Sequence, residues 1–470
     1  MNGWEGRSYS VEAYPKGDLR NSIYDGIFAN MFATLTGGVF LTGFALFLGM
    51  SEFMIGLLAS MPFLVTIFQL PTSYFLMKYG NRKKIALGAA AIARLIWIPI
   101  LTTAFIPNLS TSAKALVILG LLFISYAFIS ISYVSWLSWI SDLVPDSIRG
   151  SFFGTRNMLC GAAGMVVMVV SGKLLDVLNG QSYKGLPLGF AFAFTLAVFF
   201  GMLSLRFINR ISEPQREQVE KTRSFGESIG LPLKEPRFRS FLIFAFLWSF
   251  SVHIASPFFT LYFLRELRFS YGFVAALGVL SALADMLGMR FWGKISDRVR
   301  NKAVIRLAGW IAVFLPLLWV TVRPESVIMP VLLHLLGGGF WAGINLCMNN
   351  LLLRISPQDY RAWYFSTYNI LGGLGAAIAP VLAGLFLKLL GDLDFQIFSW
   401  NLVPLHLIFI ISTLFRLLSI QILKYVREPE EAPVGQIVRV LRSARGLSMT
   451  NGFNYLLHPF IEILENKHES

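Results

Sequence analysis

The chain has 470 residues, of which 55% are hydrophobic and 14% charged, and its mean hydropathy is +0.63. A soluble globular protein is about 45–50% apolar and about 25% charged, so this composition excludes a soluble domain and indicates an integral membrane protein. The net charge of +14 is explained better by basic loops beside an anionic lipid leaflet than by nucleic-acid binding.

The N-terminal segment, residues 1–22, has no apolar core before a small-residue cleavage site, so we expect no cleaved signal peptide. Twelve apolar blocks follow, and a helix needs about 20 such residues to cross a bilayer. Their expected limits are 24–49, 53–79, 83–106, 113–140, 151–178, 187–209, 239–264, 271–295, 302–322, 326–353, 363–390 and 398–424. We expect an all-α membrane protein, because backbone polar groups in lipid must be satisfied within each segment. The alternation typical of barrel strands is absent.

The blocks fall into two groups of six. We expect one six-helix bundle over residues 23–210 and another over 238–425, joined by a polar linker at 211–237 that contains prolines and glycines. The tail, 426–470, places apolar residues on one helical face and arginines elsewhere. This pattern indicates an amphipathic helix at the membrane surface, and a tail without a helix is the alternative.

Lysine and arginine are unevenly divided between the two sides of the membrane. One side carries the linker and the loops after spans 2 and 8, with Lys78, Arg82, Lys83, Lys84, Lys294, Arg298, Arg300 and Lys302. The basic side is expected to be cytoplasmic, which puts both termini in the cytoplasm. We expect the protein in a bacterial cytoplasmic (inner) membrane.

A short motif occurs twice at a constant spacing. Five identical pairs share the offset 357 − 145 = 212: Pro145 and Pro357, Arg149 and Arg361, Phe153 and Phe365, Thr155 and Thr367, and Asn157 and Asn369. A weaker echo pairs residues 47–56 with 263–272 at an offset of 216. A chain that repeats at about half its length consists of two copies of one structural unit.

Twelve spans, a parallel repeat and a basic central linker resemble the major facilitator superfamily of secondary transporters. The loop signature of that family, roughly G-x-x-x-D-x-x-G-R-[KR], is matched in part by Gly293 and Asp297 after span 8. After span 2, Gly80 and Arg82 match it, but Met77 stands where the acid is expected. The resemblance covers about residues 22–425 and implies two pseudo-symmetric six-helix bundles.

The resemblance also implies a cytoplasmic gate. Asp297 is expected to cap the start of span 5, near Gly150, where a carboxylate is stabilised by about 0.3–1 kcal/mol. The other expected gate residues are Gly293, Arg298, Gly80, Arg82, Arg149, Arg156 and Arg361. Because Met77 carries no charge, we expect the second-half loop to latch the gate. The alternative is that Asp297 is a solvated loop charge.

Ionisable groups inside the membrane cost about 2.5–3.5 kcal/mol each on insertion scales, so each needs a reason. Four lie deep by residue count: Arg94, His253, Asp285 and Arg290. We expect Asp285, His253 or both to carry a coupled proton, because burial favours the neutral carboxyl group and histidine titrates near neutral pH. The alternatives are that Asp285 pairs with Arg94 or Arg290, and that His253 is a core residue.

By the same resemblance, spans 1, 4, 7 and 10 line a solute site near the middle of the membrane. The candidate cavity residues are Asn30, Thr34, Tyr126, Tyr133, Trp136, Trp341 and Asn345. Tyr133 and Asn345 share the 212 offset and should face each other. Such side chains suit a neutral solute with hydroxyl or amide groups on an apolar body. The alternative is that they bond helix to helix.

These observations predict a proton-coupled secondary transporter for a small organic solute, acting by alternating access. The alternatives are proton-driven efflux of amphipathic drugs or lipid-like molecules, which Asp25 at the edge of span 1 disfavours, and a non-transporting scaffold. An enzyme is not expected, because the chain has no Gly-Lys-Ser/Thr phosphate loop, no His-Glu-x-x-His and no clear nucleophile–base pair. We expect no cofactor or metal, no nucleic-acid partner, and a monomer.

Overall fold

The structure is a computed structural model that describes residues 16–106, 108–145, 147–178, 182–183, 186–214, 232–391, 395–397 and 400–428. The expected tail helix and most of the expected linker lie outside these residues. Twelve helical segments in the described part are long and apolar enough to cross a membrane. Ten of them begin and end within four residues of the expected limits, because charge, proline or glycine bounds each apolar block. The last begins at Pro404 rather than at residue 398, because residues 400–402 form a strand.

The N-terminal half contains the first six spans. Its elements are α1 (Lys16–Leu35), α2 (Gly38–Phe47), α3 (Glu52–Leu64), η1 (Val65–Phe68), α4 (Gln69–Tyr79), α5 (Arg82–Leu95), α6 (Trp97–Thr103), α7 (Thr111–Leu143), α8 (Arg149–Leu178), β1 (Ser182–Tyr183), β2 (Leu186–Pro187) and α9 (Leu188–Ile208). Strands β1 and β2 form a short antiparallel hairpin between the fifth and sixth spans.

The C-terminal half repeats this plan. Its elements are α11 (Pro236–Arg265), α12 (Tyr271–Val299), α13 (Asn301–Trp319), α14 (Ile328–Ile355), η2 (Gln358–Tyr360), α15 (Arg361–Leu390), β3 (Phe395–Ile397), β4 (Trp400–Leu402), α16 (Pro404–Ile422) and η3 (Leu423–Tyr425). Strands β3 and β4 form a hairpin at the position that β1 and β2 occupy in the first half.

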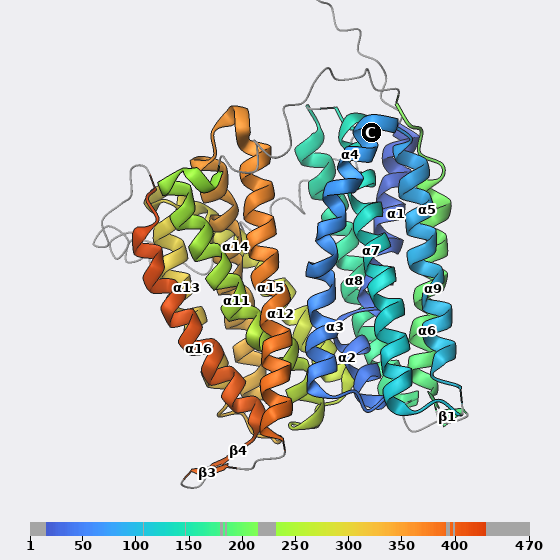
Figure 1. Ribbon diagram of the computed structural model, residues 1–470, viewed down its shortest axis with the longest axis vertical. Helices are drawn as coiled ribbons and strands as arrows, with labels where there is room; N and C mark the ends of the chain where they lie inside the picture. The colour runs from blue at the N-terminus through green and yellow to red at the C-terminus, as the bar shows by residue number, and fades with distance from the viewer. Residues whose placement is uncertain are drawn as a thin grey trace, which may run out of the picture.

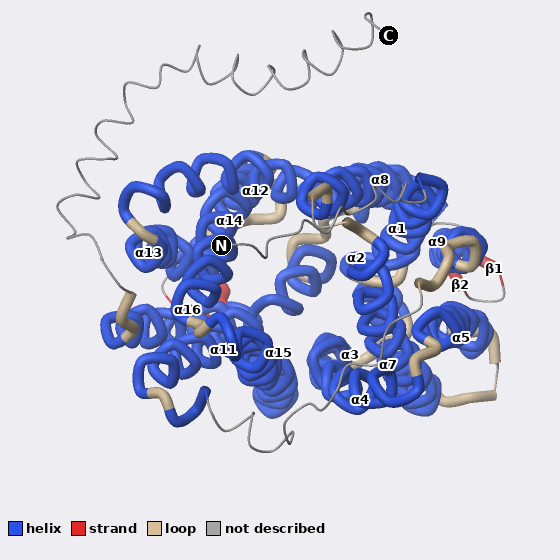
Figure 2. The backbone as a smooth tube through the Cα atoms, turned by 90° about the horizontal axis from the view of Figure 1, so that it is seen from above, coloured by secondary structure: helices blue, strands red, loops and turns tan. Residues whose placement is uncertain are grey.

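Figure 1 shows two helical bundles side by side, with α1–α9 in one and α11–α16 in the other. Figure 2 shows them from above, with α3 next to α15 and α8 next to α12 along the boundary. We call the end with β1–β4 the hairpin end. The opposite end, where α1 begins and α16 ends, is called the linker end.

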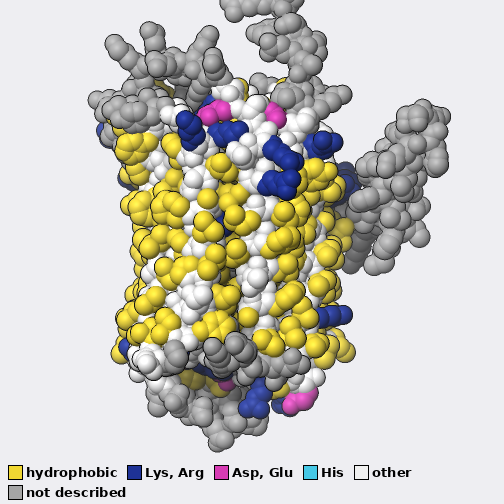
Figure 3. Space-filling model, turned by 90° about the vertical axis from the view of Figure 1, so that its right-hand side faces the viewer, with side chains coloured by type: hydrophobic (Ala, Val, Ile, Leu, Met, Phe, Trp, Pro, Cys, Tyr) yellow, Lys and Arg dark blue, Asp and Glu magenta, His cyan; other side chains and the backbone are white. Residues whose placement is uncertain are grey.

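The surface agrees with a position in lipid. Figure 3 shows hydrophobic side chains over the middle of one face, with most Lys and Arg side chains towards the two ends. Exposed large apolar residues occur in both halves, for example Val170, Val177 and Leu389. In water such a surface would be unfavourable, but in a bilayer it faces acyl chains.

The first span begins earlier than expected. We expected it to start at residue 24, but α1 starts at Lys16 and the apolar segment at Gly17. The first turns are polar, so the apolar pattern alone does not reveal them. Asp25 therefore lies nine residues inside the helix, about 13 Å from its start. This corrects its expected place at the edge of the span.

Glycines allow neighbouring spans within the second half to pack backbone to backbone. A Cβ added to Gly338 of α14 would overlap the carbonyl oxygen of Ser281 on α12, and one on Gly288 would lie 2.7 Å from the carbonyl oxygen of Gly339. Small residues at such crossings are typical of membrane helices, where close van der Waals contact drives association.

Replacing Gly338 by valine is therefore expected to separate α12 from α14 and to lower the free energy of unfolding by about 1–3 kcal/mol. Thermal unfolding of the purified protein in detergent measures this effect. The adjacent Gly339→Ala is the control, because a Cβ there meets no atom within 4 Å. Equal unfolding temperatures for Gly338→Val and Gly339→Ala would contradict the expectation.

Candidate functional site

The two halves are bonded to each other at the hairpin end. The carboxylate of Asp176, near the end of α8, accepts hydrogen bonds from the backbone N–H groups of Tyr271 (2.7 Å) and Gly272 (2.8 Å) at the start of α12. Glu52 of α3 forms an ion pair with Arg265 of α11. Within the described residues, the hydrogen bonds and ion pairs between the halves all lie at this end.

Close packing seals the same end. A Cβ added to Gly56 of α3 would overlap the carbonyl oxygen of Pro380 in α15, and one on Gly384 would lie 2.6 Å from the carbonyl oxygen of Glu52. Nearer the middle of the spans, the ring of Phe63 packs edge-on against the ring of His253, with 4.7 Å between centroids. Contact between the halves thus runs from the hairpin end to about the middle of the protein.

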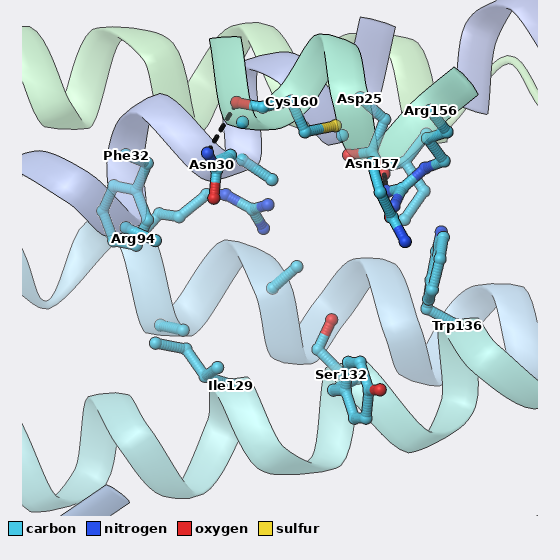
Figure 4. Close-up of a pocket in the computed structure, with 18 residues that line it drawn as sticks. Asp25, Asn30, Phe32, Arg94, Ile129, Ser132, Trp136, Arg156, Asn157 and Cys160 are labelled. Carbon is cyan, nitrogen blue, oxygen red and sulfur yellow. Dashed lines mark hydrogen bonds and ion pairs between the residues drawn. The ribbon is translucent and has the colours of Figure 1, made fainter. Parts of the chain in front are cut away.

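Two cavities lie between the spans on the linker-end side of these contacts. The first, of about 500 Å³, is lined by helices of the N-terminal half (Figure 4). The second, of about 530 Å³, lies mainly between α11, α14 and α15, with α3, η1 and α4 on its other side. Tyr133 of α7 lines both cavities, and 53% of its surface is exposed. The Tyr133 side chain is therefore part of the wall of both spaces.

Three charged residues and one serine, from four helices, lie together at the first cavity. Asp25 of α1, with 4% of its surface exposed, accepts a hydrogen bond from the hydroxyl of Ser204 on α9. That hydroxyl accepts a hydrogen bond of 2.8 Å from Nη2 of Arg94 on α5. Arg156 of α8 lies on the other side, with Nη2 4.0 Å from Oδ2 of Asp25. We call Asp25, Arg94, Arg156 and Ser204 the charged cluster.

Arg156 is held in place by its neighbours. Its Nε donates to the carbonyl oxygen of Ser22 at 3.1 Å, and its guanidinium carbon lies 4.3 Å from the centre of the Trp136 ring. Figure 4 shows Arg156 beside Trp136, and Asn30 bonded to the carbonyl oxygen of Cys160. A guanidinium on an indole face is stabilised by about 0.5–2 kcal/mol, depending on solvation. These contacts fix the positively charged guanidinium group of Arg156 at the cavity wall.

The second cavity is lined by apolar and uncharged polar side chains together with His253. Nδ1 of His253 lies 2.7 Å from the carbonyl oxygen of Ser249, one turn earlier on α11. Trp341, Asn345 and Asn349 of α14 line it together with Asn369 of α15. No acidic side chain is among the described residues that form this wall.

The internal repeat is preserved in the cavity walls. Asn157 lines the first cavity and Asn369 the second, at the offset 369 − 157 = 212. Tyr133 and Asn345, with the same offset, both line the second cavity. The structure therefore brings equivalent positions of both halves to the space between them.

A family model of the Major Facilitator Superfamily matches residues 26–380, which is more than half of the chain. The chain belongs to the major facilitator superfamily. A comparison with curated protein sequences found no match.

Solved structures of this superfamily share the fold at low sequence identity. A point mutant of the nucleoside transporter NupG has a TM-score of 0.68 at 13% identity, covering 87% of this chain and 100% of that one. A bacterial homologue of the human lysosomal transporter Spinster, inward-facing and occupied, gives 0.65 at 14% identity over 89% and 100%. An inward-facing bacterial homologue of the iron transporter ferroportin gives 0.65 at 12% identity over 89% and 100%. At these identities the likeness concerns the fold alone.

The residues expected at the gate of this superfamily member bond within their own halves or face solvent. Arg82 forms ion pairs with Asp142 and, at 3.7 Å, with Glu213. Arg149 donates to the carbonyl oxygens of Ser141 and Val144. Neither Arg82 nor Arg149 therefore bonds to the C-terminal half in these contacts. Gly80 has a φ of +65°, which glycine adopts readily, at the turn before α5.

On the second-half side of the expected gate, Asp297, Arg298 and Arg361 are exposed, and Gly293 packs towards Leu346. No hydrogen bond or ion pair joins Asp297 to another described residue. The expected contact between Asp297 and the start of α8 is not made in this conformation, because the halves are held together at the opposite end.

Four expected site residues lie outside both cavity walls. Asp285 is partly exposed on α12 and forms no hydrogen bond or ion pair with a described residue, Arg94 and Arg290 included. Arg290 is exposed. Tyr126 packs against the apolar core, and Thr34 donates to the carbonyl oxygen of Asn30 on its own helix. Of the expected deep groups, Arg94 and His253 line cavities.

The sequence analysis did not identify two charged residues that are buried in the structure, Asp25 and Arg416. Asp25 is the second residue of the expected first span, so the sequence places it at the edge of the membrane, whereas the helix begins at Lys16. Arg416 of α16 is 3% exposed and lies within the last apolar block, where a single arginine at position 13 of 19 is the available signal. Its Nη1 donates to the carbonyl oxygen of Ala312 at 2.8 Å, and its guanidinium carbon lies 5.6 Å from the Trp341 ring centre.

Proposed function

We propose that this member of the superfamily is a secondary active transporter that moves a small organic solute by alternating access and uses a proton gradient. One observation carries the proposal: the halves are bonded at the hairpin end, while two cavities that share Tyr133 in their walls lie on the other side. Access from one side at a time is the physical requirement for such a carrier. A non-transporting scaffold would need no such space.

The orientation follows from charge. The linker end carries Arg82, Lys83 and Lys84 at the start of α5 and Arg298 and Arg300 at the end of α12. Basic loops favour the cytoplasmic side, so the cavities face the cytoplasm in this proposal. Two structural neighbours, described as inward-facing, support this conformation as one that the fold adopts.

Proton coupling is assigned to Asp285 and His253. Asp285 has no cation beside it among the described residues, so no ion pair holds it in the charged form. His253 lies in the second cavity wall and touches Phe63 of the opposite half. A protonation change there acts at a contact that must break when the halves rock.

The test is transport in proteoliposomes across a panel of organic solutes, with and without a pH gradient of either direction. Movement of at least one solute, faster than in protein-free vesicles, is the expected result. No movement of any solute in either direction would overturn the carrier function.

Asp285→Asn is expected to retain solute exchange but to lose accumulation driven by a pH gradient, because the amide cannot gain or lose a proton in the relevant range. The matched control is Arg290→Gln, which removes an exposed charge one and a half turns away on α12. Undiminished gradient-driven accumulation in Asp285→Asn would remove this residue from the coupling mechanism, and His253→Gln would then be the next variant.

A further inference from the structure

The first cavity carries more positive than negative charge. Arg94 and Arg156 line it, and Asp25 is the only acid in the described part of its wall. The two guanidinium groups exceed the carboxylate by one charge, and by two if Asp25 is protonated. The net charge of the cavity wall is positive whether Asp25 is ionised or protonated. Asp285, the acid expected from the sequence to lie deepest, is in neither cavity wall.

The hydrogen-bonding capacity of these arginines is not used up. Arg94 is 8% exposed, and its Nε is buried without a hydrogen-bond partner. Arg156 has one hydrogen bond to Ser22 and lies at 4.0 Å from Asp25, which leaves donors for another group. A buried guanidinium needs a counter-charge, because the cost of desolvating it is several kcal/mol. Among the described residues of this wall, one carboxylate, that of Asp25, faces the two guanidinium groups of Arg94 and Arg156.

A third arginine adds to the positive potential of the second cavity. Arg416 lies behind Trp341, which lines that cavity, and no acid pairs with it in the described chain. Its Nε, like that of Arg94, is buried without a partner. Both cavities therefore lie in a positive field within a medium that screens charge weakly.

A cation would meet unfavourable conditions at the one carboxylate. Asp25 already accepts a hydrogen bond from Ser204 and faces Arg156. An incoming ammonium group would have to displace these contacts and approach two guanidinium groups. Guanidinium groups instead bind carboxylate and phosphate oxygens through paired N–H donors.

We infer that the solute is an organic anion whose carboxylate or phosphate binds Arg156 and Arg94 and whose apolar body lies against Trp136 and Tyr133. This rests on the proposed carrier function and replaces the neutral solute that the amide and aromatic residues suggest. The space of about 500 Å³ beside the charged cluster suits a small organic molecule, because ligand pockets hold about 300–1,000 Å³. Asn30 and Asn157 supply polar contacts on the same wall.

Four probes with similar bodies and different charge test the inference: phenylacetate, phenyl phosphate, the neutral phenylacetamide and the cationic phenethylamine. The measurement is the unfolding temperature of the full chain in phosphatidylcholine nanodiscs at increasing probe concentration. We expect a saturable increase with at least one anion and none with the amide or the amine, because only a ligand of the folded state stabilises it. An equal increase with the amide or amine, or none with either anion, would overturn the inference.

Variants locate the site. Arg156→Gln is expected to raise the anion concentration for half the temperature shift by about ten-fold or more, because it removes one partner of a buried charge pair. Arg156→Lys, which keeps the charge but loses the paired donors, is expected to show a smaller increase. Arg290→Gln is the control with no change. An unchanged half-shift concentration in both Arg156 variants would contradict the site, and Arg156→Lys serves alone if Arg156→Gln does not fold.

Two further experiments distinguish a lipid anion from a free one, and failure of the anion inference from failure of the carrier function. Nanodiscs that contain phosphatidic acid test whether a lipid headgroup supplies the anion: competition between phosphatidic acid and phenyl phosphate supports the inference and assigns the source to lipid. In proteoliposomes, transport of a neutral or cationic solute without any anion would overturn the inference and leave the carrier function intact. Absence of all transport would overturn the carrier function itself.

Discussion

Gly56→Val is expected to open the hairpin end and to stop transport. The valine side chain would overlap the backbone of Pro380, which is inside α15 and cannot move aside as a flexible side chain can. Overpacking of this kind costs about 1–3 kcal/mol, and each 1.36 kcal/mol changes an equilibrium about ten-fold. The conformation with the cavities reached from the linker end should therefore lose most of its population.

Cysteine labelling measures that population. A cysteine in place of exposed Asn349, in the second cavity wall, reports access from the linker end in a chain whose buried Cys160 and Cys347 are changed to serine. We expect its labelling rate to fall by about ten-fold with Gly56→Val. Gly120→Val is the control, because a Cβ at Gly120 meets no atom within 4 Å. Equal labelling rates in the two variants would contradict a closed hairpin end.

Asp25→Ala is expected to produce the largest loss of stability among substitutions in the first cavity. It leaves Arg94 and Arg156 without a carboxylate, and removal of one partner from a buried ion pair costs about 3–5 kcal/mol. Thermal unfolding in detergent without added anion measures this loss. We expect Asp25→Ala combined with Arg94→Gln to recover part of it, because the double variant contains one less uncompensated charge.

Two results would speak against this account of the charged cluster. One is an unfolding temperature of Asp25→Ala equal to that of Asp18→Ala, whose carboxylate is at the exposed linker end and bonds to Ser212. The other is a double variant that is less stable than either single variant. Either result would mean that water, rather than Asp25, compensates the arginines.

The span limits follow closely from the sequence because they depend on local composition. An apolar block bounded by charge, proline or glycine, such as the one that ends at Arg265, sets the limits of its helix without reference to the other spans. The 212 offset also carries information beyond the loops, since Asn157 and Asn369 reach the cavity walls at equivalent places. Membership of the superfamily, inferred from these features, is confirmed by the family model.

The charged cluster could not be predicted in the same way. Asp25, Arg94 and Ser204 lie on three spans, and no local pattern states that a hydroxyl on α9 joins a carboxylate on α1 to a guanidinium on α5. The depth of a residue in the membrane is also hard to estimate from the sequence. Asp25 follows a polar first turn, and Arg416 is one cation in a long apolar run. Which side chains meet depends on how six helices rotate about their axes, which packing of the whole bundle decides.

Helices α8 and α12 run in opposite directions, so each begins beside the end of the other. Asp176, near the end of α8, binds the free N–H groups at the start of α12. Asp297, near the end of α12, bonds to none of the described residues. Tilting one helix against the other lengthens the distance at one end as it shortens it at the opposite end. We therefore expect the two acids to bind in turn: a conformation in which Asp297 contacts the start of α8 should release Asp176 from the start of α12.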